Sequence, residues 1–530
     1  MTAMRNLTDK RLLARDTARI GMGSVDVRPG GYMTSINPRG MHCSGVWFAA
    51  CISGVVTLAP VHADALSLKV NTPFDLVDVA PGDGKCEANL VLPLPGGGPP
   101  LVLKVCSLRA AVQEANAHAG KDSIVVPKGT YRLLRKGKGE LASATGDLNV
   151  TRSVDIKGAG PSNTIIDGGV CADPEDPNCT SENVLSDTDR VLSIVNDGAN
   201  PTVRIEGLTI QNGGGLDVQG GGVRVYKGAY VTIVRSRIRE NKSRQFGGGI
   251  MNSGNLAVID SAIIRNTLPI YTLGGQTSSG GGILNDASGK LEVLRSLIAE
   301  NEAVRGAGIR NGGGSIKIVN STISGNKATG SGGGLWNLGS ATIAFTTIAF
   351  NEANRQIAVM GSEVRVGGGI YNLVSQTGDT ITNIAMGNSI LGKNTDNRGK
   401  FDDQFAPDCH STTNFAFDSF RGNVVGVLNS NCIFKDTIFG NTKFDQVGSE
   451  TSPLDPQLAT LAANGGLSRT HVLLSTSPAV DKGTGTTSAT FFDCRGEDQR
   501  LYGRPVDGNG SGTKECDAGA FERGAKPPAG

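Results

Sequence analysis

The chain has 530 residues, of which 75 are glycine, and aromatic residues make up only 5%. This composition argues against an ordinary helical globule and favours many short strands joined by tight turns, where glycine adopts backbone angles that other residues resist. The 51 basic and 49 acidic residues nearly balance. The charge therefore argues against nucleic-acid binding and against electrostatic docking to a membrane.

Residues 1–63 contain a candidate secretory signal. Residues 44–61 carry no charge, Arg39 precedes them, and small residues end the segment. This pattern predicts export with cleavage after Ala63. The stretch before it is long for a signal peptide, and two internal methionines could be the true start: Met33 and Met41. The alternative is a retained membrane anchor, because about 18 apolar residues can just span a bilayer.

Cysteine usage supports export. Removal of Cys43 and Cys51 with the signal leaves eight cysteines, an even number typical of structural disulfides in an oxidising compartment. No Cys-x-x-Cys motif occurs, and the histidines of the exported part are scattered, so we expect no metal site. Neighbours in the sequence form four close pairs, although eight cysteines allow 105 pairings: Cys86 and Cys106, Cys171 and Cys179, Cys409 and Cys432, and Cys494 and Cys516.

Residues 64–120 are predicted to form an N-terminal cap. Within them, residues 106–120 show helical spacing: Leu108, Val112 and Ala115 share one face. Ser107 can cap the start of this helix and Gly120 can end it. An apolar helix ahead of a repeat array can cover the first repeat and block edge pairing. Residues 122–133 and 148–169 then follow as early, less regular repeats.

A repeat dominates residues 121–395. Three of the five steps between the closing asparagines equal 25 residues; these asparagines are Asn241, Asn266, Asn301, Asn326, Asn351 and Asn394. Apolar residues recur three, eight and ten positions before each asparagine, and Ser or Thr recurs five positions before it. The apolar residues eight and ten positions before the asparagine are two residues apart, which is the period of a strand with one buried face. A bend and a second short strand follow.

Glycine corners separate the repeats. Triplets such as 247–249 and 332–334 recur, with Gly-Ala-Gly at 306–308 as a variant, and an apolar residue and then an asparagine follow. Such units cannot bury an apolar face alone, but stacked coils can, with ladders of identical residues. We therefore predict an all-β fold, a right-handed parallel β-helix. The recurrence excludes a phosphate-binding loop, which is a single glycine loop that opens a helix.

Both ends of the exported chain resemble known families. "PGDGKCEANL" followed by "KVCSLRAAVQEANA" resembles the CSLREA-type N-terminal region, and residues 455–483 with 494–522 resemble the choice-of-anchor Q module. The resemblance implies an exported bacterial β-helix protein, often surface-associated, without an established catalytic activity. It assigns residues 396–522 to a disulfide-stapled C-terminal module. Members commonly end in a sorting anchor, but the tail at 523–530 has no apolar segment, which puts anchoring in doubt.

The sequence predicts no catalytic residue. A glycosidase needs two carboxylates that face one cleft, and a β-helical lyase would need clustered aspartates for calcium with a basic residue. Glu240, Arg265 and Glu300 instead suggest an exposed charge ladder along the stack. Three aspartates near Cys409 favour a solvated loop over a metal site: Asp402, Asp403 and Asp408.

Two long insertions mark a candidate binding site. Residues 267–279 and 352–366 leave the coil at the same corner, three coils and about 14 Å apart. Two walls over a floor of short turns would form a groove. Its proposed ligand-binding residues are Tyr271 in one wall, Arg355 and Arg365 in the other, and Arg305 on the floor. The alternative is a pair of ordinary, tolerated insertions.

The sequence therefore predicts a secreted or cell-surface, non-catalytic, adhesin-like monomer that binds a polysaccharide or another surface. We expect no cofactor and no nucleic-acid partner, and membrane contact only if the signal is retained. Two alternatives remain open: a polysaccharide lyase or glycoside hydrolase, and a purely structural rod.

Overall fold

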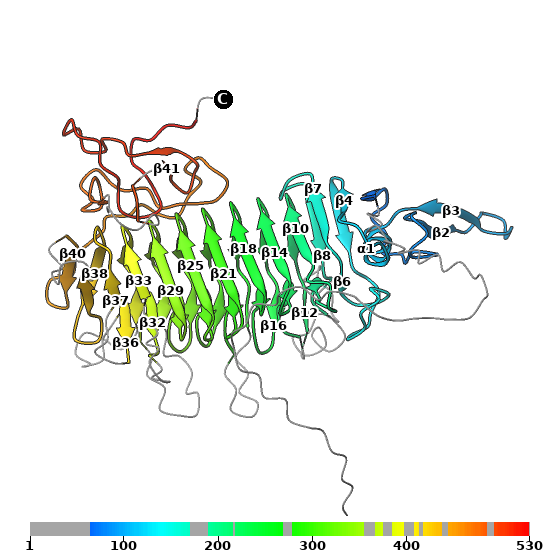
Figure 1. The fold of residues 1–530 in the computed structure, drawn as a ribbon, viewed down its shortest axis with the longest axis horizontal. Helices are drawn as coiled ribbons and strands as arrows, with labels where there is room; N and C mark the ends of the chain where they lie inside the picture. Colours follow the sequence, from blue (N-terminus) through cyan, green and yellow to red (C-terminus); the bar gives the residue numbers. More distant parts are fainter. Residues whose placement is uncertain are drawn as a thin grey trace, which may run out of the picture. The chain divides into compact units, whose positions relative to one another are not determined.

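A computed structural model describes residues 64–169, 189–215, 218–268, 278–353, 366–374, 384–396, 407–412, 417–436, 444–484, 492–494 and 496–528. The candidate signal therefore lies outside the described residues. The described chain winds into stacked coils, so that three long parallel sheets run along the stack (Figure 1). Each coil passes from sheet 1 through sheet 2 to sheet 3 and then returns to sheet 1. The fold is a parallel β-helix, as the repeat predicts.

Each coil from β4 to β36 contributes one short strand to each sheet. Sheet 1 contains β1 (Ser67–Lys69), β4 (Asp122–Val126), β7 (Val154–Gly158), β10 (Thr202–Glu206), β14 (Tyr230–Val234), β18 (Asn255–Ile259), β21 (Lys290–Leu294), β25 (Ser315–Val319), β29 (Ser340–Ala344), β33 (Ile384–Gly387), β37 (Phe417–Ser419) and β39 (Phe434–Asp436). Sheet 2 contains β5 (Gly129–Arg132), β8 (Thr164–Asp167), β11 (Thr209–Gln211), β15 (Arg237–Arg239), β19 (Ala262–Ile264), β22 (Leu297–Ala299), β26 (Thr322–Ser324), β30 (Thr347–Ala349), β34 (Ile390–Gly392), β38 (Val424–Leu428) and β40 (Gln446–Ser449).

Sheet 3 contains β6 (Leu148–Val150), β9 (Leu192–Ile194), β13 (Val223–Val225), β17 (Ile250–Asn252), β20 (Ile283–Asn285), β24 (Ile309–Asn311), β28 (Leu335–Asn337), β32 (Ile370–Asn372) and β36 (Cys409–Ser411). Between sheets 2 and 3, two-residue strands form short ladders: β12 (Gly214–Gly215) with β16 (Lys242–Ser243), and β23 (Glu302–Ala303), β27 (Lys327–Ala328), β31 (Glu352–Ala353) and β35 (Thr395–Asp396). Gly496–Glu497 (β41) pairs with Gly503–Arg504 (β42) in the C-terminal segment.

The apolar residues that recur at equivalent positions of the sequence repeat are paired with one another in the parallel sheets. Ile263 lies between Ile238 and Ile298 in neighbouring coils of sheet 2, and all three side chains are fully buried. In sheet 1, Val258 pairs with Val293. The inward-facing side chains of all three sheets form one continuous core, because each strand can bury its apolar face only against the opposite walls of its own coil and the coils on either side.

Two polar ladders stabilise the bends that join sheets 1, 2 and 3. At the first bend the Oγ of Ser261 accepts a bond from the Ser236 amide (3.1 Å) and donates one to the Ile259 carbonyl (2.7 Å). At the second bend the Oδ1 of Asn301 accepts from both nitrogens of Asn266 (2.9 and 3.0 Å). The residue before each of these side chains has positive φ, a conformation that turns the chain sharply. The polar groups of the bends are thus buried but paired.

Backbone packing between coils explains the glycine corners. The first glycine of each triplet has a φ between +58° and +75°. A Cβ on the third glycine would meet a carbonyl oxygen of the next coil, at 2.6 Å for Gly282 and 2.5 Å for Gly308. These positions leave no room for a side chain, because successive corners stack backbone on backbone.

Replacing Gly308 by alanine is therefore expected to lower the free energy of unfolding by about 1–3 kcal/mol, the usual cost of overpacking. The matched control is Gly98→Ala, since a Cβ there meets no atom within 4 Å. Urea unfolding followed by circular dichroism measures both variants. Equal midpoints would contradict the crowded corner.

The N-terminal segment covers the first coil. Helix α1 (Leu108–Ala117) begins at Ser107, whose hydroxyl accepts a bond from the Ala110 amide (3.0 Å), and Leu108 and Val112 join the core of the coils. The helix ends with His118 as its C-cap, two residues before the predicted Gly120. Arg109 is almost fully buried and forms an ion pair with Asp75.

The structure places β1, which precedes the helix, in sheet 1 beside β4. A disulfide joins Cys86 to Cys106 just ahead of α1.

The stack of coils extends beyond residue 395, where the regular repeat ends. Among the described strands, β36 ends sheet 3, β37 and β39 continue sheet 1, and β38 and β40 continue sheet 2 as far as Ser449. A disulfide joins Cys409 to Cys432 there. The sequence repeat stops earlier because insertions of unequal length lie between these last strands and remove the 25-residue spacing.

Asp408 is buried, and the expectation of a solvated loop there is wrong. Its Oδ1 accepts bonds from the Asn394 side chain (3.0 Å) and backbone amide (3.2 Å), and its Oδ2 accepts from the Val427 amide (2.8 Å). It takes the place of the next asparagine in the ladder. Asp402 and Asp403 lie outside the described residues.

The C-terminal segment packs on the outer face of sheet 2 (Figure 1). Leu473, Ala518 and Phe521 form a second core with Ala349 and Ile390, two outward-facing side chains of that sheet.

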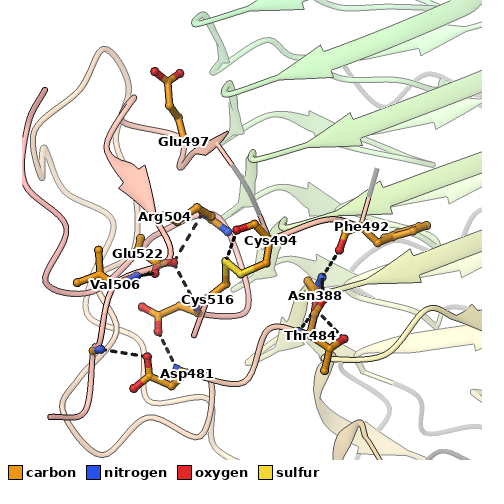
Figure 2. The surroundings of a disulfide bond; sticks show 12 residues. Asn388, Asp481, Thr484, Phe492, Cys494, Glu497, Arg504, Val506, Cys516 and Glu522 are labelled. Carbon is orange, nitrogen blue, oxygen red and sulfur yellow. Dashed lines mark hydrogen bonds and ion pairs between the residues drawn. A yellow bond between two sulfur atoms is a disulfide. The ribbon is translucent and has the colours of Figure 1, made fainter. Parts of the chain in front are cut away.

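Polar contacts fasten the same segment at the bend between sheets 1 and 2. The Asn388 side chain donates to the carbonyls of Thr484 and Phe492, both at 3.0 Å, beside the disulfide between Cys494 and Cys516 (Figure 2). The expected pair Cys171 and Cys179 lies outside the described residues.

Among the described residues, no helix has the length and apolar composition that crossing a membrane requires.

Candidate binding site

The exposed face of sheet 1 carries a shallow groove across five coils, from β14 to β29. Alternate residues of these strands point inward, as Val231, Leu256 and Ile316 do, and their neighbours point outward. The groove has a volume of about 500 Å³ and is lined by Tyr230, Val231, Thr232, Asn255, Leu256, Ala257, Lys290, Leu291, Glu292, Ser315, Ile316, Lys317, Ser340 and Thr342.

The groove is rich in hydrogen-bonding groups. Hydroxyls, an amide and two ammonium groups line it, and Tyr230 at one end is 51% exposed. Glu292 provides its one carboxylate, which forms an ion pair with Lys317 (Nζ to Oε1, 2.8 Å). With Lys290, the lining therefore carries one more positive than negative charge. Such a surface suits a polar, extended ligand with some acidic groups.

The geometry of the groove does not match a glycosidase site. Glycoside hydrolysis uses a pair of carboxylates that flank the scissile bond. Glu292 is the one carboxylate among the residues that line the groove. Among the described residues, no three His, Cys, Asp or Glu side chains lie close enough together to hold a metal ion.

Only one of the four ligand-binding residues predicted from the sequence is described. Arg305 lies at the corner that leads into sheet 3, where its backbone bridges to Ser279. Burial lowers the pKa of its guanidinium, while the neighbouring Tyr371 opposes the shift. The other three lie outside the described residues: Tyr271, Arg355 and Arg365. The groove between the two insertions therefore stays a prediction.

A column of large side chains beside Arg305 was missed by sequence reasoning. Arg310 lies over the ring of Trp336 (4.9 Å), which stacks with Tyr371 (centroids 6.0 Å apart), which in turn stacks with His410 (5.5 Å). These residues occupy the middle, outward-facing position of successive strands of sheet 3. In the sequence, three of them directly precede the asparagine that follows a glycine corner, a signal that could have revealed the column.

The rings of this column are buried rather than exposed to solvent. Trp336 is 4% and Tyr371 9% exposed, and both pack against Val366. Burial, together with the charge of Arg305, lowers the pKa of Arg310 to about 10. We therefore assign these rings a packing role and place the candidate ligand site in the groove of sheet 1.

Residues 177–351 match the family model of the right-handed β-helix region. This match agrees with the strand order and gives the hand of the coil. No curated protein sequence matches the chain.

Two solved structures resemble the β-helix. One is pectate lyase Pel9A, with 14% identity and a TM-score of 0.40 over 79% of this chain and 92% of that chain. The other is the A-module of mannuronan C-5 epimerase AlgE6 from Azotobacter vinelandii, with 15% identity and a TM-score of 0.26 over 65% of this chain and 94% of that chain. At these values neither similarity carries an argument about activity.

The charge ladder predicted along the β-helix is formed in part. Arg265 pairs with Glu240 (3.1 Å). Glu300 pairs instead with Arg469 of the C-terminal segment (2.6 Å). The ladder is interrupted because that segment covers sheet 2 from β19 onward.

A second hollow of the β-helix, of about 560 Å³, lies at the bend between sheets 1 and 2 beside Leu467. It contains two carboxylates, Glu206 and Asp260, but both are held in ion pairs. Glu206 binds Arg204 at 2.8 Å and also Arg235, and Asp260 binds Arg295 at 2.7 Å. Neither carboxylate is therefore placed as a free acid or base.

Proposed function

We propose that this is an exported, non-catalytic β-helix protein that binds an extended glycan along the groove of sheet 1, with an adhesin-like role at a cell surface or outside the cell. The observation that carries the proposal is the exposed, polar groove with Tyr230 at one end. Neighbouring strands are about 4.8 Å apart, so the groove is about 19 Å long from β14 to β29. That length suits a chain of several sugar units better than a small molecule.

Charge favours an acidic glycan. Lys290 has no carboxylate opposite it in the groove lining, whereas Lys317 is paired with Glu292. A uronate carboxylate near Lys290 would gain a charge-assisted hydrogen bond. Arg305, with the predicted Tyr271, Arg355 and Arg365, would add a second contact surface around the corner toward sheet 3.

The alternative activity, a polysaccharide lyase or glycoside hydrolase, is tested by incubating the purified protein with a panel of acidic and neutral polysaccharides, with and without calcium. We expect retention on an acidic polymer without release of shorter products. Cleavage of any polymer would overturn the non-catalytic proposal.

Tyr230→Ala is expected to weaken binding of the retained polysaccharide about three- to tenfold, because a sugar ring that stacks on the phenol loses contact area and a hydrogen bond. Phe74→Ala is the control, since Phe74 is equally exposed (52%) but lies outside the groove. Isothermal titration calorimetry measures both. Equal losses in the two variants, or no loss in either, would remove Tyr230 from the site.

We also propose that the two ends belong to the CSLREA and choice-of-anchor Q families. The motif Asp-Ala-Gly-Ala-Phe-Glu at 517–522 lies in the segment that resembles the choice-of-anchor Q module, and its contacts support this assignment. The Gly519 amide donates to the Asn388 carbonyl (2.9 Å), and a Cβ on Gly519 would lie 2.7 Å from Ile390 and Thr347. Phe521 is buried at the same interface. The motif thus fastens the C-terminal segment to sheet 2.

A further inference from the structure

The hairpin of β2 (Ala88–Leu92) and β3 (Leu101–Val105) is unusually apolar for an exposed element. Residues 88–103 contain no charge. Six of their large apolar side chains are between 38% and 54% exposed: Val91, Leu92, Leu94, Leu101, Val102 and Leu103. A contiguous exposed apolar patch on a protein in water marks a contact surface.

Both faces of the hairpin are apolar. In the antiparallel register, Leu92 pairs with Leu101 on one face, and Val91 pairs with Val102 on the other. In the described structure these two strands form a sheet of their own. A two-stranded hairpin is marginally stable in water, so an apolar environment that covers both faces would stabilise it. A flat protein surface would cover only one face of the hairpin, whereas a lipid phase surrounds both.

The turn is also adapted to an apolar medium. Its eight residues, Pro-Leu-Pro-Gly-Gly-Gly-Pro-Pro at 93–100, include four prolines. Proline has no backbone N–H, so the turn exposes fewer donors that would lose hydrogen bonds on leaving water. Charged residues reappear only toward the base: Asp83 and Glu87 are the acidic ones, and the basic ones are the exposed Lys85 and Lys104. Their ammonium groups could remain among lipid headgroups while the tip enters the acyl region.

The exposed area argues against a second copy of the chain. Six side chains that are about half exposed offer roughly 500 Å², below the ~800 Å² that each partner of a stable complex buries. We propose that the tip of the β2–β3 hairpin inserts into the surface of a phospholipid bilayer. The insertion is shallow, because the strands pair their backbones within the hairpin but leave both outer edges open.

The test uses the full chain with Leu94→Trp, a reporter at the tip. Tryptophan emission is recorded with vesicles of phosphatidylcholine, and with vesicles of phosphatidylethanolamine and phosphatidylglycerol, after subtraction of the unsubstituted protein. We expect a blue shift and quenching by brominated phospholipid. Adding Leu101→Glu is expected to lower the lipid-bound fraction at least about tenfold. Phe74→Trp, an exposed reporter outside the hairpin, should show neither effect.

An unchanged emission spectrum for Leu94→Trp would overturn the proposal. A blue shift that appears without vesicles, rises with protein concentration and accompanies a doubled mass in light scattering would assign the hairpin to a second copy instead. The assay contains no polysaccharide, so its result is independent of glycan binding in the groove.

Discussion

Replacing Asn301 by alanine is expected to lower the free energy of unfolding by about 3–6 kcal/mol. Its side chain donates to the Ile263 carbonyl (3.0 Å) and to Oδ1 of Asn326 (2.9 Å), and accepts both bonds from Asn266. All of these groups are fully buried. The alanine variant therefore leaves several polar groups without partners, at about 1–3 kcal/mol for each group.

Urea unfolding, followed by circular dichroism, measures this loss. Asn255→Ala is the matched control, because Asn255 is half-buried on the groove face of β18 and outside the ladder; surface substitutions of this kind usually change stability by less than about 0.5 kcal/mol. Hydrogen exchange should show the largest increase at the amides of Asn266 and its neighbours in the adjacent coils. If both variants unfolded at the same urea concentration, the ladder would contribute little to stability.

Asp408 is expected to make the protein less stable as pH rises from about 4 to about 7. Burial raises the pKa of its carboxyl to about 7, with a further contribution from Asp396, against the opposing effect of the hydrogen bonds from Asn394 and Val427. An unfolded chain would lose this proton near pH 3.9. Between these values the folded state holds one more proton than the unfolded state. Each rise of one pH unit therefore lowers the free energy of unfolding by up to about 1.4 kcal/mol, or by about 4 kcal/mol over the whole range.

The Asp408→Asn variant should lack this dependence. Its amide can keep the oxygen contacts with Asn394 but loses the bond from the Val427 amide, a cost of about 1–2 kcal/mol that does not vary with pH. We expect the variant to be less stable than the unsubstituted protein at pH 4, of similar stability near pH 5 and more stable at pH 8, by urea unfolding.

Asp507→Asn is the control for this prediction. Asp507 is half-buried, and backbone hydrogen bonds, chiefly from Gly512, lower its pKa, so it stays ionised across this range. Parallel stability curves for the unsubstituted protein and Asp408→Asn would show that Asp408 does not titrate there.

The candidate site in sheet 1 could be predicted from the sequence only in part. The outward positions of sheet 1 could be read from the sequence as the residues between the buried columns, such as Thr232 and Lys317. That these positions form a groove depends on how the strands of five coils curve together, and no local pattern encodes that curvature. The sequence therefore predicted a binding site at the insertions around Arg305, because their unusual length stands out against the regular repeat.

Asp408 illustrates the same limit. It follows Asn394 by 14 residues rather than 25, so the repeat could not place it in the ladder. Its position is visible only when the Asn394 side chain is seen to donate to it. The same holds for Glu300, whose partner Arg469 lies 169 residues away in the sequence.

The sequence by itself determined the β-helix, because each coil repeats the same short-range problem. Each coil needs an apolar residue at every second strand position, a bend at a serine or asparagine, and a glycine where the backbones of successive coils touch. Contacts within one coil and with its neighbours meet these needs, so the repeating pattern of residues predicts the fold. Only the tertiary structure decided where the C-terminal segment packs, how sheet 1 forms a groove and which residue ends the asparagine ladder. Those contacts join parts of the chain that do not repeat, and nothing in their local sequence specifies the partner.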